Sequence, residues 1–351
     1  MKISVLTFSK ETNYGANLQC YALCKTLQGM GHQVVILDIQ LKRLYMPWYS
    51  AIMGLPMIIL FDKFRKKHLN LFTRHFNDVD DLCRNCPQSD LFIVGSDQVW
   101  NPTITKRLDP LVYFFSFLPK GTRRMSYAAS FGTETWEYPE LTDDVYKLLR
   151  QFDTISVREE MGVEICKQFF NVDAKLVVDP TLLLPTYDNI CGRYDPKREA
   201  NELTYFTFVH STTTQKILAD FAKSHHLSAV VLRSNRPYPG FKRKLYVSIE
   251  EWLNSIRYSK IVVTNSYHCM VFCILFHKKF VAIPAKSERS NRQIHLLNVL
   301  GLSRYYCSDT QYLPEILNHA LADNIDYNTV DIIIDSLRKQ ALDYLHTNIR
   351  L

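Results

Sequence analysis

The sequence predicts an α/β protein with two domains, each built on a parallel β-sheet that is covered by helices. Its 351 residues are enough for two domains of ordinary size. A content of 47% hydrophobic and 22% charged residues is typical of a folded globular chain. Short strand-like apolar segments alternate with helix-like segments along most of the chain. This alternation is the pattern of parallel sheets with helices on their faces.

The first domain is predicted to span residues 1–185. A strand over 3–8 is followed by a helix whose apolar residues Cys20, Leu23, Cys24 and Leu27 recur at helical spacing. The next strand, over 34–38, completes a βαβ unit. Further strands are predicted at 91–94, 125–128, 154–157 and 176–178, with helices over 141–152 and 159–170.

The second domain is predicted to span residues 200–310, after a turn-rich stretch containing Pro185 and Pro196. Ser248 and Glu251 have the spacing of a capping box and predict the start of a helix. The other predicted elements are strands at 203–209, 229–232, 261–264 and 280–283, a helix over 214–225 and a helix that carries Cys269, Phe272 and Phe276. Residues 311–351 are predicted to be helical, and whether they cross back to the first domain is left open. Two such domains facing each other would enclose a cleft.

Composition narrows the choice of partners. The formal charge of +7 and pI near 8.8 favour anionic ligands, but Lys and Arg are scattered, so nucleic acid is not expected as a partner. The cysteines are odd in number and fall mainly in apolar helical patterns, which suits a reducing cytoplasm. Cys83 and Cys86 form a Cys-x-x-Cys without a second pair at zinc spacing, so we interpret them as loop thiols and expect no metal.

The sequence shows no recognisable signal peptide or membrane span, and a cytoplasmic location is expected. The N-terminal segment turns polar too early for a signal peptide. Residues 46–61 are apolar but short of the roughly 20 residues of a membrane span, and Pro47 and Pro56 interrupt them. We predict a core helix here, followed by a solvated one. Because Lys63, Arg65, Lys66 and Lys67 follow directly, a peripheral contact with the inner face of an anionic cell membrane remains an alternative.

An anion site is predicted at the start of the helix that follows strand 261–264. Asn265, Ser266 and His268 form a polar elbow there, and a helix N-terminus offers unpaired N–H groups to a phosphate or carboxylate. Arg292, which opens a later helix, is expected to join His268 over the same anion. The alternatives are that His268 only caps or packs and that Arg292 is a surface residue.

Polar residues also follow the first strand of the first domain. Asn13, Tyr14, Gly15 and Asn17 lie between this strand and its helix, with Gln19 one turn later. The segment is not G-x-G-x-x-G, so a dinucleotide site is poorly supported. Amide and phenol groups suit a sugar instead, although an ordinary tight turn is the alternative.

A second polar loop follows strand 91–94. Ser96, Asp97, Gln98 and Trp100 combine an acid, an amide and an indole, a mixture that can hold a carbohydrate, with Asp97 as a general base on a sugar hydroxyl. The alternative is that Ser96 and Asp97 cap a helix while Trp100 packs.

Arg158 ends strand 154–157. A guanidinium there can grip a carboxylate or phosphate with two parallel hydrogen bonds. A strand-end Arg also commonly pairs with a nearby acid, and Glu159 and Glu160 are adjacent.

Six blocks, in this order, resemble the polysaccharide pyruvyl transferase family: NYGANLQ, FIVGSDQVWNP, SYAASFG, ISVREE, VVDPTLLL and VVTNSYHCMVF. The resemblance runs from the first strand to about Arg304. It implies two Rossmann-like domains arranged as in GT-B glycosyltransferases, with phosphoenolpyruvate as co-substrate and no other cofactor. Arg158 and His268 match family positions associated with donor binding. Many members carry Arg two residues before this His, where the chain has Ser266.

The resemblance therefore implies transfer of pyruvate from phosphoenolpyruvate to two hydroxyls of a sugar in a lipid-linked precursor of a surface polysaccharide. His268 and Asp97 are the predicted catalytic residues. Donor binding is assigned to Arg158, Asn265, Ser266 and Arg292, and acceptor binding to Asn13, Tyr14, Gly15, Asn17, Gln19, Ser96, Gln98 and Trp100. The alternatives are a GT-B-like glycosyltransferase that uses a nucleotide sugar and a non-catalytic glycan-binding scaffold.

Overall fold

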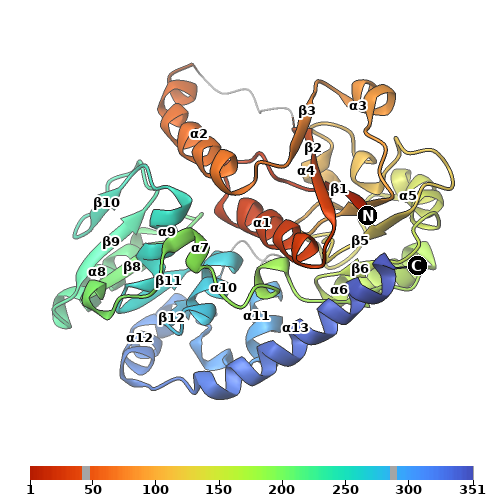
Figure 1. The fold of residues 1–351 in the computed structure, drawn as a ribbon. Helices are drawn as coiled ribbons and strands as arrows, with labels where there is room; N and C mark the ends of the chain where they lie inside the picture. The colour runs from red at the N-terminus through yellow and green to blue at the C-terminus, as the bar shows by residue number, and fades with distance from the viewer. Residues whose placement is uncertain (42–47, 285–290, 351) are drawn as a thin grey trace. The chain divides into compact units, whose positions relative to one another are not determined.

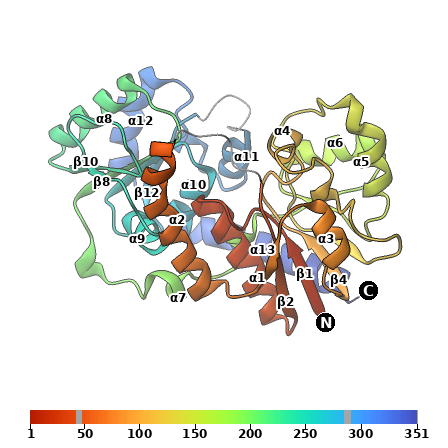
Figure 2. The same ribbon diagram turned by 90° about the horizontal axis from the view of Figure 1, so that it is seen from above.

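The computed structural model describes residues 1–41, 48–284 and 291–350, and divides the chain into two compact units (Figures 1 and 2). Unit 1 comprises Met1–Met53, Arg65–Leu184 and Asp335–Leu351. Unit 2 comprises Gly54–Phe64 and Pro185–Ile334. Both units are α/β, and each contains its own parallel sheet.

The sheet of unit 1 has the strand order β3-β2-β1-β4-β5. These strands are β1 (Lys2–Leu6), β2 (Gln33–Ile39), β3 (Phe72–Phe76), β4 (Leu91–Val94) and β5 (Arg124–Ser126), all paired in parallel. The short β6 (Ser156–Val157) and β7 (Lys175–Leu176) extend it through bridges that join Met125 to Thr154 and Ala129 to Val157. The chain moves outward from β1 in one direction and from β4 in the other. The switch point of unit 1 is therefore the edge between β1 and β4, where open α/β sheets bind ligands.

The helices of unit 1 are α1 (Tyr14–Gly29), α3 (Val79–Asn85), α4 (Pro102–Thr105), α5 (Thr142–Leu149) and α6 (Glu160–Phe170). In both views α1 runs beside β1 and β2 (Figures 1 and 2). Its predicted apolar stripe is buried, and Asn13 caps its N-terminus. The core on the β4 side is aromatic, with Trp100, Phe114 and Phe131 packed together.

Unit 2 repeats this topology with the strand order β10-β9-β8-β11-β12. The strands are β8 (Glu202–Phe206), β9 (Ser228–Leu232), β10 (Lys242–Lys244), β11 (Ile261–Thr264) and β12 (Lys279–Ala282), again paired in parallel. The helices are α7 (Asp188–Cys191), α8 (Thr212–Ser224), α9 (Ile249–Arg257), α10 (Tyr267–Leu275), α11 (Asn291–Val299) and α12 (Leu313–Ala322). The switch point of unit 2 lies between β8 and β11.

The C-terminal helix α13 (Tyr327–Ile349) contributes to both units. Its last part packs on unit 1, where Arg338 Nε donates to the Leu182 carbonyl at 2.8 Å and Tyr344 Oη donates to the Ser126 carbonyl at 3.1 Å. Residues 335–351 therefore belong to unit 1, a return that the sequence left open.

Helix α2 (Trp48–His68) differs from the prediction. We expected a core helix over 46–61 and then a solvated one; residues 46 and 47 lie outside the described residues, and a single helix continues through Pro56. Its apolar half carries exposed side chains, whereas Phe61, Phe64 and Arg65 nearer its C-terminus are buried. The predicted burial was wrong because the sequence pattern shows that these residues are apolar but not which side of the helix packs against the core. Among the described residues, no helix combines the length and apolarity needed to cross a bilayer.

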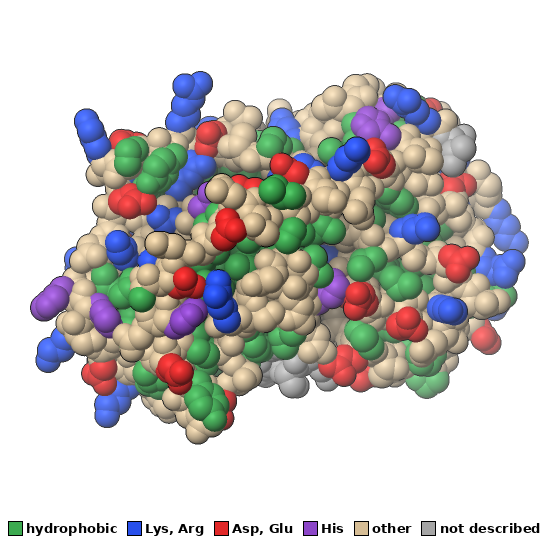
Figure 3. Space-filling model, turned by 90° about the horizontal axis from the view of Figure 1, so that it is seen from below, with side chains coloured by type: hydrophobic (Ala, Val, Ile, Leu, Met, Phe, Trp, Pro, Cys, Tyr) green, Lys and Arg blue, Asp and Glu red, His purple; other side chains and the backbone are tan. Residues whose placement is uncertain are grey.

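Charged side chains of both signs are mixed on the surface, as the scattered Lys and Arg in the sequence predict. On the face drawn in Figure 3, Lys and Arg side chains lie among Asp and Glu rather than in one stripe. Cys83 lies in α3 and not in a loop, whereas Cys86 follows this helix, and both thiols are free. Burial raises the pKa of Cys86 to about 12 and also raises the pKa of Cys83. Such thiols stay protonated at neutral pH, which disfavours thiolate chemistry.

Candidate functional site

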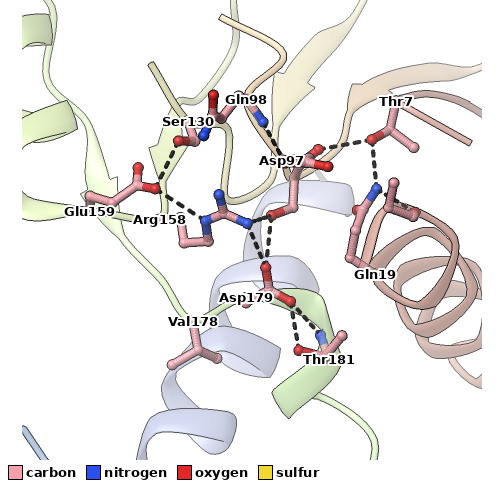
Figure 4. Close-up of polar contacts among 12 residues, drawn as sticks. Thr7, Gln19, Asp97, Gln98, Ser130, Arg158, Glu159, Val178, Asp179 and Thr181 are labelled. Atoms are coloured by element: carbon pink, nitrogen blue, oxygen red, sulfur yellow. Dashed lines mark hydrogen bonds and ion pairs between the residues drawn. The ribbon is translucent and has the colours of Figure 1, made fainter. Parts of the chain in front are cut away.

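The two polar loops of unit 1 meet at its switch point. Thr7, just after β1, donates from Oγ1 to the carbonyl of Ser96, just after β4, at 2.8 Å (Figure 4). Gln19 Nε2 in turn donates to Thr7 Oγ1 at 2.8 Å. The parallel sheet thus joins the NYGANLQ segment to the GSDQVWNP segment through one short chain of hydrogen bonds.

Arg158 lies at the centre of a buried polar network beside this junction (Figure 4). Its side chain is 2% exposed, and Nη1 lies 2.8 Å from Asp179 Oδ2. Nε donates to Glu159 Oε1 at 3.2 Å, and Nη1 reaches Ser96 Oγ at 3.4 Å. The guanidinium is therefore held by protein groups, one of which is the adjacent acid that the sequence offered as its alternative partner.

Asp179 was missed by the sequence interpretation. It is fully buried, and its Oδ1 accepts from the Thr181 backbone N–H at 2.9 Å and from Thr181 Oγ1 at 2.7 Å. Asp179 stands 21 residues from Arg158. The available signal was the VVDPTLLL block, in which an acid precedes Pro-Thr directly after the predicted strand 176–178.

Three predicted acceptor-binding residues are core residues in the structure. Trp100 is fully buried, stacks on Phe114 with ring centroids 5.3 Å apart, and donates from Nε1 to the Tyr113 carbonyl at 3.0 Å. Asn17 and Gln19 are also fully buried. Asn17 Nδ2 donates to two carbonyls of its own loop, each at 2.8 Å. The prediction that these side chains contact a sugar is corrected, because they have no exposed surface and instead hold the loops in place.

Gln98 and Ser96 are also buried. Gln98 Oε1 accepts from Asn101 Nδ2 at 3.2 Å, and its side chain lies against Gly132. A Cβ built on Gly132 would come within 2.6 Å of Gln98 Cδ, and Gly132 has a φ of +70°. Glycine is therefore required at this position of the SYAASFG segment, both for space and for backbone conformation.

Asp97 and Asn13 are the predicted acceptor-side residues with accessible surface. Asp97 is half-buried, and its φ of +76° is uncommon for a residue other than glycine. Its backbone carbonyl accepts from the Ser130 N–H at 3.1 Å, which fixes the loop. Asn13 is exposed and caps α1, while Tyr14 and Gly15 are buried in the first turn.

In unit 2, Asn265 bridges the switch point. Its Oδ1 accepts from the backbone N–H of Phe208 at 2.9 Å and so ties the loop after β8 to the end of β11. The residue is 3% exposed, and its Nδ2 has no acceptor within the described part of the chain. An amide donor left over in a buried position is costly unless a ligand or water accepts from it.

Ser266 is the N-cap of α10, and its side chain accepts from the backbone N–H of Cys269 at 3.4 Å. It has β-region backbone angles, as N-caps do. We interpreted Ser266 as standing in place of a donor-binding Arg. Its observed contact is local and explains why a short hydroxyl side chain suits this position.

His268 follows in the first turn of α10 and is nearly buried. Its ring packs edge-on against Tyr267, with centroids 5.3 Å apart. Arg292, from the first turn of α11, lies over the same Tyr267 ring at 5.7 Å. The structure therefore places Arg292 and His268 beside one tyrosine, near an N-terminus whose dipole favours negative charge.

An open pocket of about 990 Å³ also lies in unit 2, along α8. It is lined by this helix and by the segment 236–240, and its lining includes His210 but neither Asn265 nor His268. The predicted anion site and this pocket are therefore different places.

Two Rossmann-like domains of this topology are typical of the GT-B fold, and solved structures share this fold with the chain. A protein assigned as a UDP-N-acetylglucosamine 2-epimerase from Listeria monocytogenes has a TM-score of 0.60 at 10% identity, over 99% of this chain and 95% of that one. An α-glucosyltransferase in complex with UDP and DNA has a TM-score of 0.52 at 11% identity, over 99% and 95%. Spinosyn forosaminyltransferase SpnP has a TM-score of 0.51 at 12% identity, over 97% and 95%.

Within this class the sequence identifies the family. Residues 13–287 match the profile of the polysaccharide pyruvyl transferase family, so the chain belongs to that family and its general role is pyruvyl transfer. No curated protein matches the chain in sequence.

Proposed function

We propose that the protein transfers pyruvate from phosphoenolpyruvate to two hydroxyls of a sugar in a surface-polysaccharide precursor. The first hydroxyl oxygen loses its proton to a general base and bonds to C2 of the donor, while the methylene carbon gains a proton and becomes a methyl group. The second hydroxyl oxygen then displaces phosphate from C2, and its proton leaves with the phosphate. The products are a cyclic pyruvate ketal and inorganic phosphate, and no oxidant or reductant is consumed.

The observation that supports this proposal best is the group of donors at the start of α10. The buried Asn265 amide offers a hydrogen from Nδ2, the first turn of the helix offers backbone N–H groups, and Arg292 lies nearby over Tyr267. Phosphoenolpyruvate carries a phosphate and a carboxylate, and both accept such hydrogen bonds. In this proposal His268, as imidazolium, gives the proton to the methylene carbon or stabilises the departing phosphate.

On the acceptor side we assign Asp97 as the general base for a sugar hydroxyl and Asn13 as a second residue of the proposed sugar site. Arg158 has a positioning role in this proposal, since its guanidinium is bonded to Asp179 and Glu159. It holds Ser96, and therefore the loop that carries Asp97, at the carboxyl edge of β4. Direct contact between Arg158 and the donor would require this network to rearrange.

The test is phosphate release from phosphoenolpyruvate in the presence of a lipid-linked sugar acceptor, with mass spectrometry of the product. We expect a pyruvate adduct, and we expect His268→Gln to abolish turnover while thermal unfolding stays near that of the parent. His346→Gln, on the exposed face of α13, is the matched control and should retain full activity.

Ligand-induced thermal shift separates this function from the two alternatives. Stabilisation by phosphoenolpyruvate supports the proposal. Stabilisation by a nucleotide sugar with none by phosphoenolpyruvate would instead identify a glycosyltransferase. Binding of glycan alone, with no turnover of either donor, would identify a scaffold.

A further inference from the structure

Helix α2 carries a concentration of exposed apolar side chains. Ile52, Met53, Leu55 and Ile59 are 62%, 48%, 51% and 47% exposed. Elsewhere in the described part of the chain, exposed large apolar residues are spread singly or in pairs over many elements. Scattered exposed residues are normal on a protein surface, but a cluster on one element indicates an interaction site.

Ile52, Leu55 and Ile59 form one stripe with a basic end, whereas Met53 lies about 100° from Ile52 around the helix. At 100° per residue, Ile52, Leu55 and Ile59 fall on the same side of the helix as the exposed Lys63, Lys66 and Lys67. The opposite side carries Met57, Phe61 and Phe64, which are buried. The core contacts of α2 are thus made by one side, and the stripe is a second apolar surface.

The pattern of the stripe fits a bilayer surface. Its apolar part, from Ile52 to Ile59, extends about 10 Å along the helix axis, and a helix lying in the plane of the interface buries such an apolar face at the headgroup boundary. The lysines continue for about 12 Å beyond Ile59, where they would meet lipid phosphates. Asp62 is half-buried and lies between the two parts as the acidic residue of this half of the helix.

We propose that α2 is a peripheral anchor for an anionic membrane. Its apolar half enters the headgroup boundary while Lys63, Lys66 and Lys67 bind lipid phosphates. A second copy of the chain fits the stripe poorly. Parallel pairing of two α2 helices would place lysines against lysines, and antiparallel pairing would place lysines against Ile52 and Leu55. The inference stands on α2 alone and does not depend on the donor or the acceptor of the proposed reaction.

The test is co-sedimentation of the full chain with vesicles of phosphatidylcholine alone or mixed with phosphatidylglycerol. We expect binding to the mixed vesicles and little binding to the neutral ones. The double variant Leu55→Glu, Ile59→Glu should lose at least about tenfold in affinity, since apolar side chains would no longer enter the lipid. Ile332→Glu, at a position 71% exposed on α13, is the matched control and should bind normally.

The charge component has its own comparison. Replacing Lys63, Lys66 and Lys67 with Gln should lower affinity for the mixed vesicles by about a hundredfold, because each Lys near an anionic surface contributes about fivefold. The control is a triple Gln variant of three lysines that are exposed on other helices, Lys167, Lys216 and Lys339.

Equal binding of every variant, or equal binding to neutral and anionic vesicles, would overturn the proposal. A second result would also overturn it: the parent protein binds neither kind of vesicle but forms a dimer in analytical ultracentrifugation, and the double variant Leu55→Glu, Ile59→Glu is a monomer. Circular dichroism and thermal unfolding of each variant establish that α2 remains folded.

Discussion

The two units share one strand order but fill their switch points in opposite ways. In unit 1 the edge between β1 and β4 is closed by protein charges, with Arg158 paired to Asp179 and bonded to Ser96. In unit 2 the edge between β8 and β11 is held by an uncharged amide, Asn265, which keeps one hydrogen-bond donor unused within the described residues. Each unit therefore has a switch point, and the side chains there determine whether this edge is a structural framework or a site for an anion.

The energetics of the two edges differ accordingly. A buried ion pair gains little over an apolar pair, because both charges must leave water, but removing one partner strands the other. A neutral amide at a helix N-terminus strands no charge, although its unused donor favours a ligand that accepts from it, and it leaves the local field positive. We therefore expect single substitutions at the switch point of unit 1 to change mainly stability. Single substitutions at the switch point of unit 2 should change mainly ligand binding.

The largest effect is expected from Arg158→Met, which leaves Asp179 buried without its cation. We expect a loss of about 3–5 kcal/mol in the free energy of unfolding, measured by denaturant titration. Arg158→Met combined with Asp179→Leu should recover part of the loss, since no charge then remains buried. If the single variant unfolds like the parent, the ion pair is not the framework of unit 1.

Asn265→Ala should have the next largest effect on stability. The Phe208 N–H loses the acceptor of a part-buried hydrogen bond, which costs up to about 1.5 kcal/mol. Because the proposed anion site loses Nδ2 as well, stabilisation by phosphoenolpyruvate should also fall, as read by thermal shift. A variant that loses stability but keeps its full response to phosphoenolpyruvate would confine Asn265 to a structural role.

Ser266→Ala tests the cap next to Asn265. Loss of an N-cap should cost about 1 kcal/mol in unfolding free energy, and Asn13→Ala, at the cap of α1 in unit 1, should cost a similar amount. The Ser266 variant should keep more of the response to phosphoenolpyruvate than Asn265→Ala does. A greater loss of response for Ser266→Ala would restore it as a donor-binding residue.

The smallest expected effect is on the stability of unit 2 at acidic pH. A hydrogen bond from Tyr305 Oη, helped by Arg304, lowers the pKa of Asp323 in unit 2. A carboxyl group with a lowered pKa in the folded state stabilises the fold above its unfolded pKa of about 3.9, and this contribution is lost as the pH falls through the folded value. Tyr305→Phe should therefore make the stability of unit 2 less dependent on pH below about 4.

Tryptophan fluorescence can separate the units in this experiment. Trp252 lies in unit 2, whereas Trp100 and Trp136 lie in unit 1. Acid titration of single-Trp versions, with and without Tyr305→Phe, should change only the transition that Trp252 reports. An identical change in the signal from unit 1 would count against a local origin.

Strands with apolar runs were predicted from the sequence with small errors. Leu91–Val94 and Ile261–Thr264 agree to the residue. The edge strands β3 and β10 were missed, since Arg74 and His75 in one and Lys242–Lys244 in the other give no apolar pattern. Edge strands have one side open to solvent and so tolerate such residues.

Burial was the least predictable property. Trp100, Asn17 and Gln19 are residue types that bind sugars when exposed, but here they are packed inside. Along α2 the error ran in the opposite direction, with apolar residues exposed. Residue type and spacing describe one element, whereas burial depends on which other elements cover it.

By itself the sequence determined the parallel α/β elements, the polar ends of their strands and the family, because these depend on residue types in short contiguous segments. Only the tertiary structure decided which polar ends meet. Arg158 has two acids next to it in the chain, yet it also pairs at 2.8 Å with Asp179, which reaches it from beyond β7. That pairing follows from strand order and the exclusion of water, and both are properties of the assembled sheet.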